Sequence, residues 1–83
     1  MKQIKYKTKG TCAREILVTL DGEYIVEVEF VGGCNGNTSG ISSLVRGMNA
    51  REAIERLKGI KCGFKPTSCP DQLALALAEC LEA

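Results

Sequence analysis

The fold of this chain is decided by residues 13–31, which read AREILVTLDGEYIVEVEFV. Apolar residues alternate with other residues on both sides of Asp21-Gly22, a dipeptide typical of hairpin turns. We therefore predict two antiparallel strands, residues 13–20 and 23–31. The side chains expected on their buried face are Ile16, Val18 and Leu20 from the first strand and Tyr24, Val26, Val28 and Phe30 from the second.

The type of hairpin turn sets the register of these two strands. A two-residue turn would place apolar residues of one strand opposite glutamates of the other. A three-residue turn with Gly22 in the left-handed conformation would pair Val18 with Tyr24. It would also pair Ile16 with Val26. Because this arrangement keeps both apolar sets on one face, we predict the three-residue turn.

Residues 3–8 alternate in the same way and form the third predicted strand. Its inward side chains are Ile4, Tyr6 and Thr8. Lys5 and Lys7 face outward, where lysines on an edge strand deter edge-to-edge pairing. Because arginine and aromatic partners are missing around them, we interpret these lysines as a solvated face and not as a nucleic-acid site.

Helical patterns follow the strands, after a loop predicted at residues 32–40 from its glycine-rich composition. The predicted helices span residues 41–46, 50–58 and 70–81. Asn49 is the expected cap of the second helix. Pro70 and Asp71 mark the first turn of the third helix.

Strands followed by helices predict an α+β fold, a three-stranded antiparallel sheet with the helices packed on one face. A chain of 83 residues makes a single domain, residues 1–83. The net charge of +1 indicates no nucleic-acid-binding tail. The longest apolar run, Leu73–Ala78, is too short to cross a membrane. Because the N-terminus has no signal-peptide pattern, we expect the protein in the cytoplasm.

The chain contains five cysteines and no histidine. An odd number cannot pair completely within one chain, and in a reducing cytosol such clusters are typical of metal sites or working thiols. Cys80 falls on the apolar stripe of the predicted third helix, so we predict that it is a small buried hydrophobic residue. The other four cysteines lie in or beside predicted loops.

These four cysteines are predicted to form one cluster. Cys12 precedes one strand of the hairpin and Cys34 follows the other, so both leave the same end of the sheet. Cys62 and Cys69 flank a single loop that can fold back on itself. With sulfur as the available donor, the cluster is suited to zinc or another soft metal.

Cys69 has the strongest local indication of reactivity. It precedes Pro70 at the start of the third predicted helix, where free backbone N–H groups and the helix dipole favour a thiolate. Lys61 and Lys65 lie nearby in the sequence and would add to this effect. Other chemistries find little support, because a Ser-His-Asp set needs a histidine and the glycine-rich loop matches no phosphate-binding pattern.

Residues 67–71 spell Thr-Ser-Cys-Pro-Asp, and Cys62-Gly63 precedes them. Together with Gly32-Gly33-Cys34, Gly36-Asn37 and Cys12, this pattern resembles the TSCPD family over nearly the whole chain. That family includes stand-alone bacterial proteins and a cysteine-rich module at the C-terminus of adenosylcobalamin-dependent ribonucleoside-diphosphate reductases. The resemblance implies that Cys12, Cys34, Cys62 and Cys69 are the characteristic cysteines.

The resemblance also implies a link to ribonucleotide reduction and so to nucleotide metabolism and DNA replication. A chain of 83 residues is too short for the barrel that such a reductase needs, so we expect no reductase activity from it alone. The leading hypothesis is a metal-binding or thiol module that acts with a larger partner, possible partners including a ribonucleotide reductase. One alternative is a redox component in which Cys62 and Cys69 cycle between dithiol and disulfide. Another is an interaction domain with inert cysteines.

Overall fold

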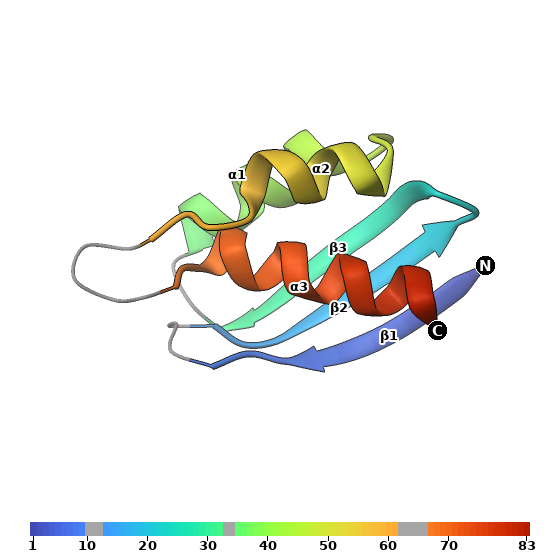
Figure 1. The fold of residues 1–83 in the computed structure, drawn as a ribbon. Helices are drawn as coiled ribbons and strands as arrows, with labels where there is room; N and C mark the ends of the chain where they lie inside the picture. Colours follow the sequence, from blue (N-terminus) through green and yellow to red (C-terminus); the bar gives the residue numbers. More distant parts are fainter. Residues whose placement is uncertain (10–12, 33–34, 62–66) are drawn as a thin grey trace.

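The computed structural model describes residues 1–9, 13–32, 35–61 and 67–83 of the chain. In chain order the elements are β1 (Lys2–Lys7), β2 (Ala13–Asp21), β3 (Tyr24–Gly32), α1 (Asn35–Val45), α2 (Ala50–Leu57) and α3 (Cys69–Glu82). The strands form one antiparallel sheet in the order β1-β2-β3. All three helices lie on the same side of this sheet (Figure 1). The predicted α+β fold is therefore confirmed.

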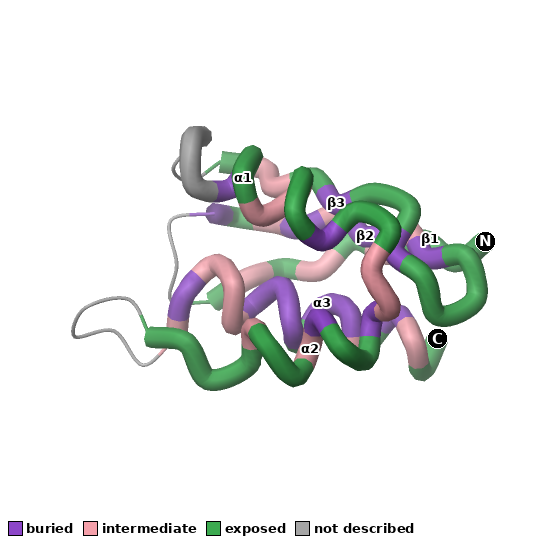
Figure 2. Tube along the Cα trace, turned by 90° about the horizontal axis from the view of Figure 1, so that it is seen from above, coloured by how far each residue is buried: buried purple, intermediate pink, exposed green. Residues whose placement is uncertain are grey.

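The core lies between the central strand β2 and helix α3. Ile16, Val18 and Leu20 of β2 are fully buried, as their alternation predicted. The buried residues of α3 that face them are Leu73, Ala76, Leu77 and Cys80. Figure 2 shows this buried stripe along α3, with exposed residues on the outer side of α2. Period-two and helical periodicity thus located the two main layers of the core correctly.

The predicted register of the hairpin is wrong. Asp21 pairs with Tyr24 across a two-residue turn in which Gly22 has a φ of 61°. Val18 pairs with Val28, and not with Tyr24 as predicted, while Ile16 pairs with Phe30 and not with Val26.

A β-bulge explains why a two-residue turn still keeps the apolar residues together. The pairing shifts between Thr19 and Leu20, so that Val26 is an extra residue on β3. The extra residue reverses the alternation, because a bulge places two residues opposite one. Ile25 and Val28 are therefore both buried, whereas Tyr24 is 60% exposed.

Helix α1 begins earlier than predicted. Residues 35–40 are helical, although their glycine, serine and asparagine content indicated a loop. The helix lies along β3 and packs on it through Ile41 and the buried Val45. Tertiary packing therefore outweighs the low helix propensity of this segment.

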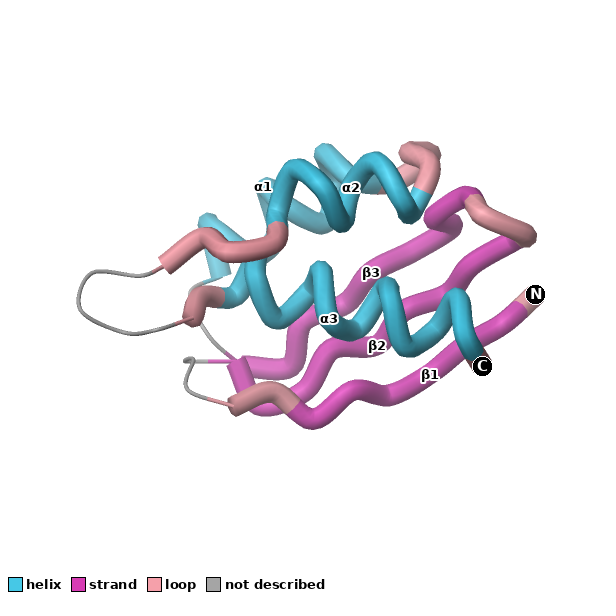
Figure 3. Tube along the Cα trace, in the orientation of Figure 1, coloured by secondary structure: helices cyan, strands magenta, loops and turns pink. Residues whose placement is uncertain are grey.

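The connection from α1 to α2 forms backbone hydrogen bonds with the start of β3, along the strand edge that faces away from β2. Ile25 donates its N–H to Met48 O at 2.9 Å, and Gly47 N donates to Ile25 O at 2.8 Å. Asn49 then caps α2 as predicted, since its side chain accepts a hydrogen bond from Arg51 N at 2.9 Å. Figure 3 shows the short loop that joins α1 to α2. Within the described ranges, no helix is both long and apolar enough to span a membrane.

Candidate functional site

The described residues include two of the five cysteines, Cys69 and Cys80. Cys12, Cys34 and Cys62 lie outside them, so the predicted grouping of four sulfurs stays a prediction. Cys80 is fully buried in the core beside the leucines of α3, which confirms its prediction as a small buried hydrophobic residue. Burial raises the pKa of the Cys80 thiol above its ordinary value, and the nearby Glu79 carboxylate adds to the rise.

Cys69 is the first residue of α3 and is partly exposed. Ser68 precedes it in an extended conformation and caps the helix, while Pro70 and Asp71 occupy the first turn. This is the position that the sequence predicted for Cys69. A side chain there lies beside the unpaired backbone N–H groups at the start of the helix.

The residues next to Cys12 and Cys34 meet in the sheet. Ala13, which follows Cys12, pairs with Gly32, which lies two residues before Cys34. Thr8 supports the same end of the sheet, since its N–H donates to Arg14 O at 3.2 Å. Ala13 and Gly32 therefore lie at one end of the sheet, while the prediction for Cys12 and Cys34 themselves falls outside the described residues. Figure 1 shows α3 beginning at this same end.

Asp71 connects the two ends of the segment that contains Cys62. One carboxylate oxygen of Asp71 accepts a hydrogen bond from Gly59 N at 2.6 Å, and the other accepts one from the Thr67 hydroxyl. Gly59 lies three residues before Cys62, and Thr67 lies two residues before Cys69. Both oxygens of Asp71 are thus engaged within the protein.

Ser68 adds a second connection at this point. Its hydroxyl donates to Ile60 O at 2.7 Å and accepts a hydrogen bond from Asp71 N at 3.2 Å. Ser68 is 4% exposed, so its hydroxyl is both the cap of α3 and an internal partner of the preceding segment.

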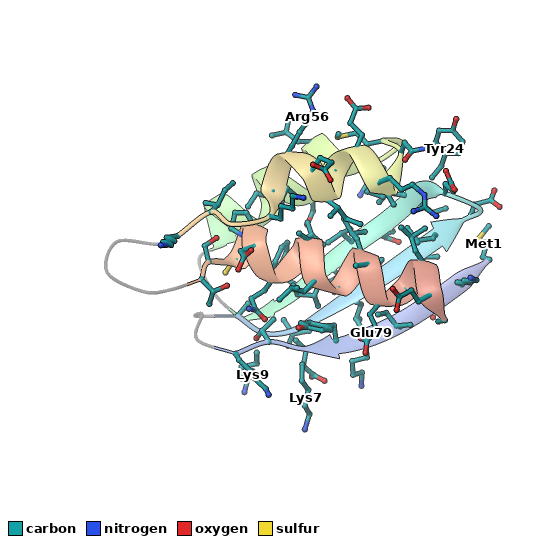
Figure 4. The ribbon with its side chains drawn as sticks, in the orientation of Figure 1. Met1, Lys7, Lys9, Tyr24, Arg56 and Glu79 are labelled. Atoms are coloured by element: carbon teal, nitrogen blue, oxygen red, sulfur yellow. The ribbon has the colours of Figure 1, made fainter. Side chains whose placement is uncertain are left out.

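Gln72 connects α3 to the end of the β1 segment. Its Oε1 accepts a hydrogen bond from Lys9 N at 3.2 Å, and its Nε2 donates to Thr67 Oγ1 at 3.0 Å. Lys9 lies three residues before Cys12. Figure 4 shows Lys9 beyond β1 at the end of the molecule where α3 begins.

The described residues at this end include one cysteine thiol, that of Cys69. Across the described parts of the chain, no three cysteine, aspartate or glutamate side chains group to hold an ion. Asp71 is engaged in hydrogen bonds, and the sequence has no histidine, so a metal here would rely on thiolates. Cys69 is the described residue that is placed to supply one. Thiolates are ligands that zinc prefers.

Cys69 and the first-turn position of Asp71 were predicted from the sequence, but the hydrogen bonds that Ser68, Asp71 and Gln72 make to other segments were not. Ser68 and Asp71 are three residues apart, the spacing of a capping box, so this pair had a recognisable signal. Gln72 had no such signal, because a polar residue in the first turn of a helix is usually exposed. It is instead 5% exposed.

Comparison with known proteins gives one result. No curated protein and no solved structure matches the chain. The sequence profile of the TSCPD domain matches residues 2–81, nearly the whole chain. The chain therefore belongs to the TSCPD domain family.

Proposed function

We propose that this protein is a soft-metal module that binds a single zinc ion through the thiolates of Cys12, Cys34, Cys62 and Cys69. The observation that carries the proposal is the meeting of the described residues beside these cysteines at one end of the sheet. Ala13 pairs with Gly32, and the first turn of α3 bonds to Lys9, which precedes Cys12, and to Gly59, which precedes Cys62.

The proposed ion would be structural and not catalytic. Four thiolates complete the tetrahedral shell of zinc and leave no open position for a substrate or a water molecule. A chain without histidine also lacks the side chain that most often moves protons at neutral pH. The proposed role of the ion is to join four segments that are distant in the sequence.

The proposed module acts with a larger partner. The family resemblance supports this, because related modules form the C-terminus of ribonucleoside-diphosphate reductases. This domain would then supply to its partner what those enzymes carry at their C-terminus.

A second candidate is a redox role for Cys62 and Cys69. It is favoured by the partly exposed position of Cys69 at the N-terminus of α3, where a thiol can be reached by a partner. In this role the two thiols would lose two electrons and two protons to a disulfide acceptor on the partner, forming a disulfide between them.

Native mass spectrometry of the purified protein, with and without reductant, separates the two candidates. The metal module predicts a bound zinc ion that acid or a chelator removes, with an unchanged polypeptide mass. The redox module predicts a metal-free protein whose mass falls by two hydrogen atoms when the reductant is omitted. A metal-free protein whose mass does not depend on reductant would contradict both candidates.

A further inference from the structure

The start of α3 contains a buried polar side chain, that of Gln72. Gln72 is 5% exposed and uses both ends of its side-chain amide, toward Lys9 N and toward Thr67 Oγ1. A buried amide is tolerated when it is hydrogen-bonded and is costly when it is not. Among the described residues, no buried side-chain nitrogen or oxygen lacks a partner.

Asp71 and Gln72 are adjacent in the sequence and share Thr67 as a partner, but each also holds a segment that the other does not. Asp71 binds Gly59 N and the Thr67 hydroxyl, which flank the Cys62 segment. Gln72 binds Lys9 N, which leads to Cys12. The two side chains thus connect the start of α3 to the residues that flank the Cys62 segment and to the end of the β1 segment, 63 positions away.

Helix α3 is packed in the hydrophobic core next to these bonds. Leu73 follows Gln72 directly and is fully buried, as is Leu77 one turn later. The hydrogen bonds of Asp71 and Gln72 described above involve amides, hydroxyls and carboxylate oxygens, and none involves a thiol. They can therefore form in the metal-free protein.

We propose that Asp71 and Gln72 are positioning residues that hold the approaches to Cys12, Cys62 and Cys69 in place before any metal binds. This inference rests on the proposed function for the nature of the ligand. It goes further in assigning to the TSCPD segment two roles, with Cys69 as a ligand and the neighbouring polar residues as the support that presents the other ligands. Preorganisation of this kind raises affinity because fewer segments must be ordered when the ion binds.

The first test uses amide hydrogen exchange of the metal-free, reduced protein, followed by NMR. In Gln72→Met, which keeps a similar side-chain volume, the Lys9 amide should exchange about tenfold faster or more, while the Gly59 amide keeps its protection. In Asp71→Ala the pattern should reverse. Equal acceleration of both amides in each variant, or unprotected amides in the wild type, would overturn the positioning role.

The second test measures zinc affinity by competition with a chelator. Gln72→Met should weaken zinc binding by about tenfold or more, the usual effect of removing a group that orients metal ligands. Ile25→Val is the control, because it removes one buried methyl group at the hairpin end of the sheet, far from α3's first turn. It should reduce stability without changing zinc affinity.

The two tests fail independently. If the wild type binds no zinc, the proposed function falls, and the exchange pattern alone decides whether Asp71 and Gln72 hold their segments. If the wild type binds zinc and Gln72→Met binds it equally well, the positioning role is overturned and the proposed function stands.

Discussion

Two cysteines of α3 lie in opposite surroundings on one helix. Cys80 is fully buried among leucines, whereas Cys69 is partly exposed at the first position of the helix. Cysteine is therefore a packing residue at the C-terminal end of α3 and a candidate ligand at its N-terminal end. This contrast makes the pair a matched test of which cysteines serve the site.

Cys80→Ala should lower the free energy of unfolding by about 1 kcal/mol, because it removes one small group from the core. Zinc stoichiometry and affinity should not change. Denaturant unfolding and zinc competition measure the two effects. The matched variant Cys69→Ala should show the reverse, with weaker zinc binding and little change in metal-free stability. Loss of zinc from Cys80→Ala would show that the fifth cysteine had been assigned wrongly.

Burial of Cys80 also predicts how stability depends on alkaline pH. The pKa of its thiol is raised above 9.0 by burial first and by Glu79 second, although Lys2 opposes the shift. The folded state thus holds this proton more tightly than the unfolded chain does. The resulting stability is fully present below pH 9.0 and is lost as the pH rises toward the folded pKa.

Unfolding of the reduced, metal-free protein between neutral pH and about pH 10 checks this. The wild type should lose more stability over that range than Cys80→Ala does, since the variant lacks the buried thiol. An identical loss in both proteins would contradict the assignment.

At the scale of elements, α1 begins in a segment whose composition predicted a loop. Gly40 lies within it, exposed, and a Cβ added there would meet no heavy atom within 4 Å. Gly47 lies just beyond the helix with a φ of 85°. One glycine is therefore replaceable and the other is required by its backbone conformation.

Gly40→Ala should stabilise the protein by about 0.5–1 kcal/mol, because alanine has the higher helix propensity. Gly47→Ala should destabilise it by about 1 kcal/mol or more, since alanine is strained at a positive φ. Thermal or denaturant unfolding of the two variants checks both signs. Destabilisation by Gly40→Ala would contradict the helical, uncrowded position of Gly40 in α1.

Elements with a strong period could be predicted from the sequence, and those shaped by packing could not. The stripe of α3 and the alternation of β2 repeat over enough residues to fix their buried faces. The bulge at Val26 left no local signal, because it depends on which register lets Ile25 and Val28 both reach the core. The start of α1 depends on its packing against β3.

At the scale of the whole molecule, the hydrophobic core and the candidate site occupy different places. The core extends between β2 and α3, while the residues beside the four cysteines meet at one end of the sheet. The sequence predicted this end from the hairpin alone. The hydrogen bond between Gln72 and Lys9 could not be predicted, because the two residues are 63 positions apart in the sequence and meet only in the folded chain.

The most direct test of the account is a titration of the reduced, metal-free protein with cobalt(II), followed by displacement with zinc. A site of four thiolates should saturate at a single ion per chain, with the intense sulfur-to-cobalt absorption of a tetrahedral thiolate site. Cys69→Ala should weaken that absorption and Cys80→Ala should leave it unchanged. Titration without saturable binding, or a thiolate signal that Cys80→Ala abolishes and Cys69→Ala preserves, would contradict the account.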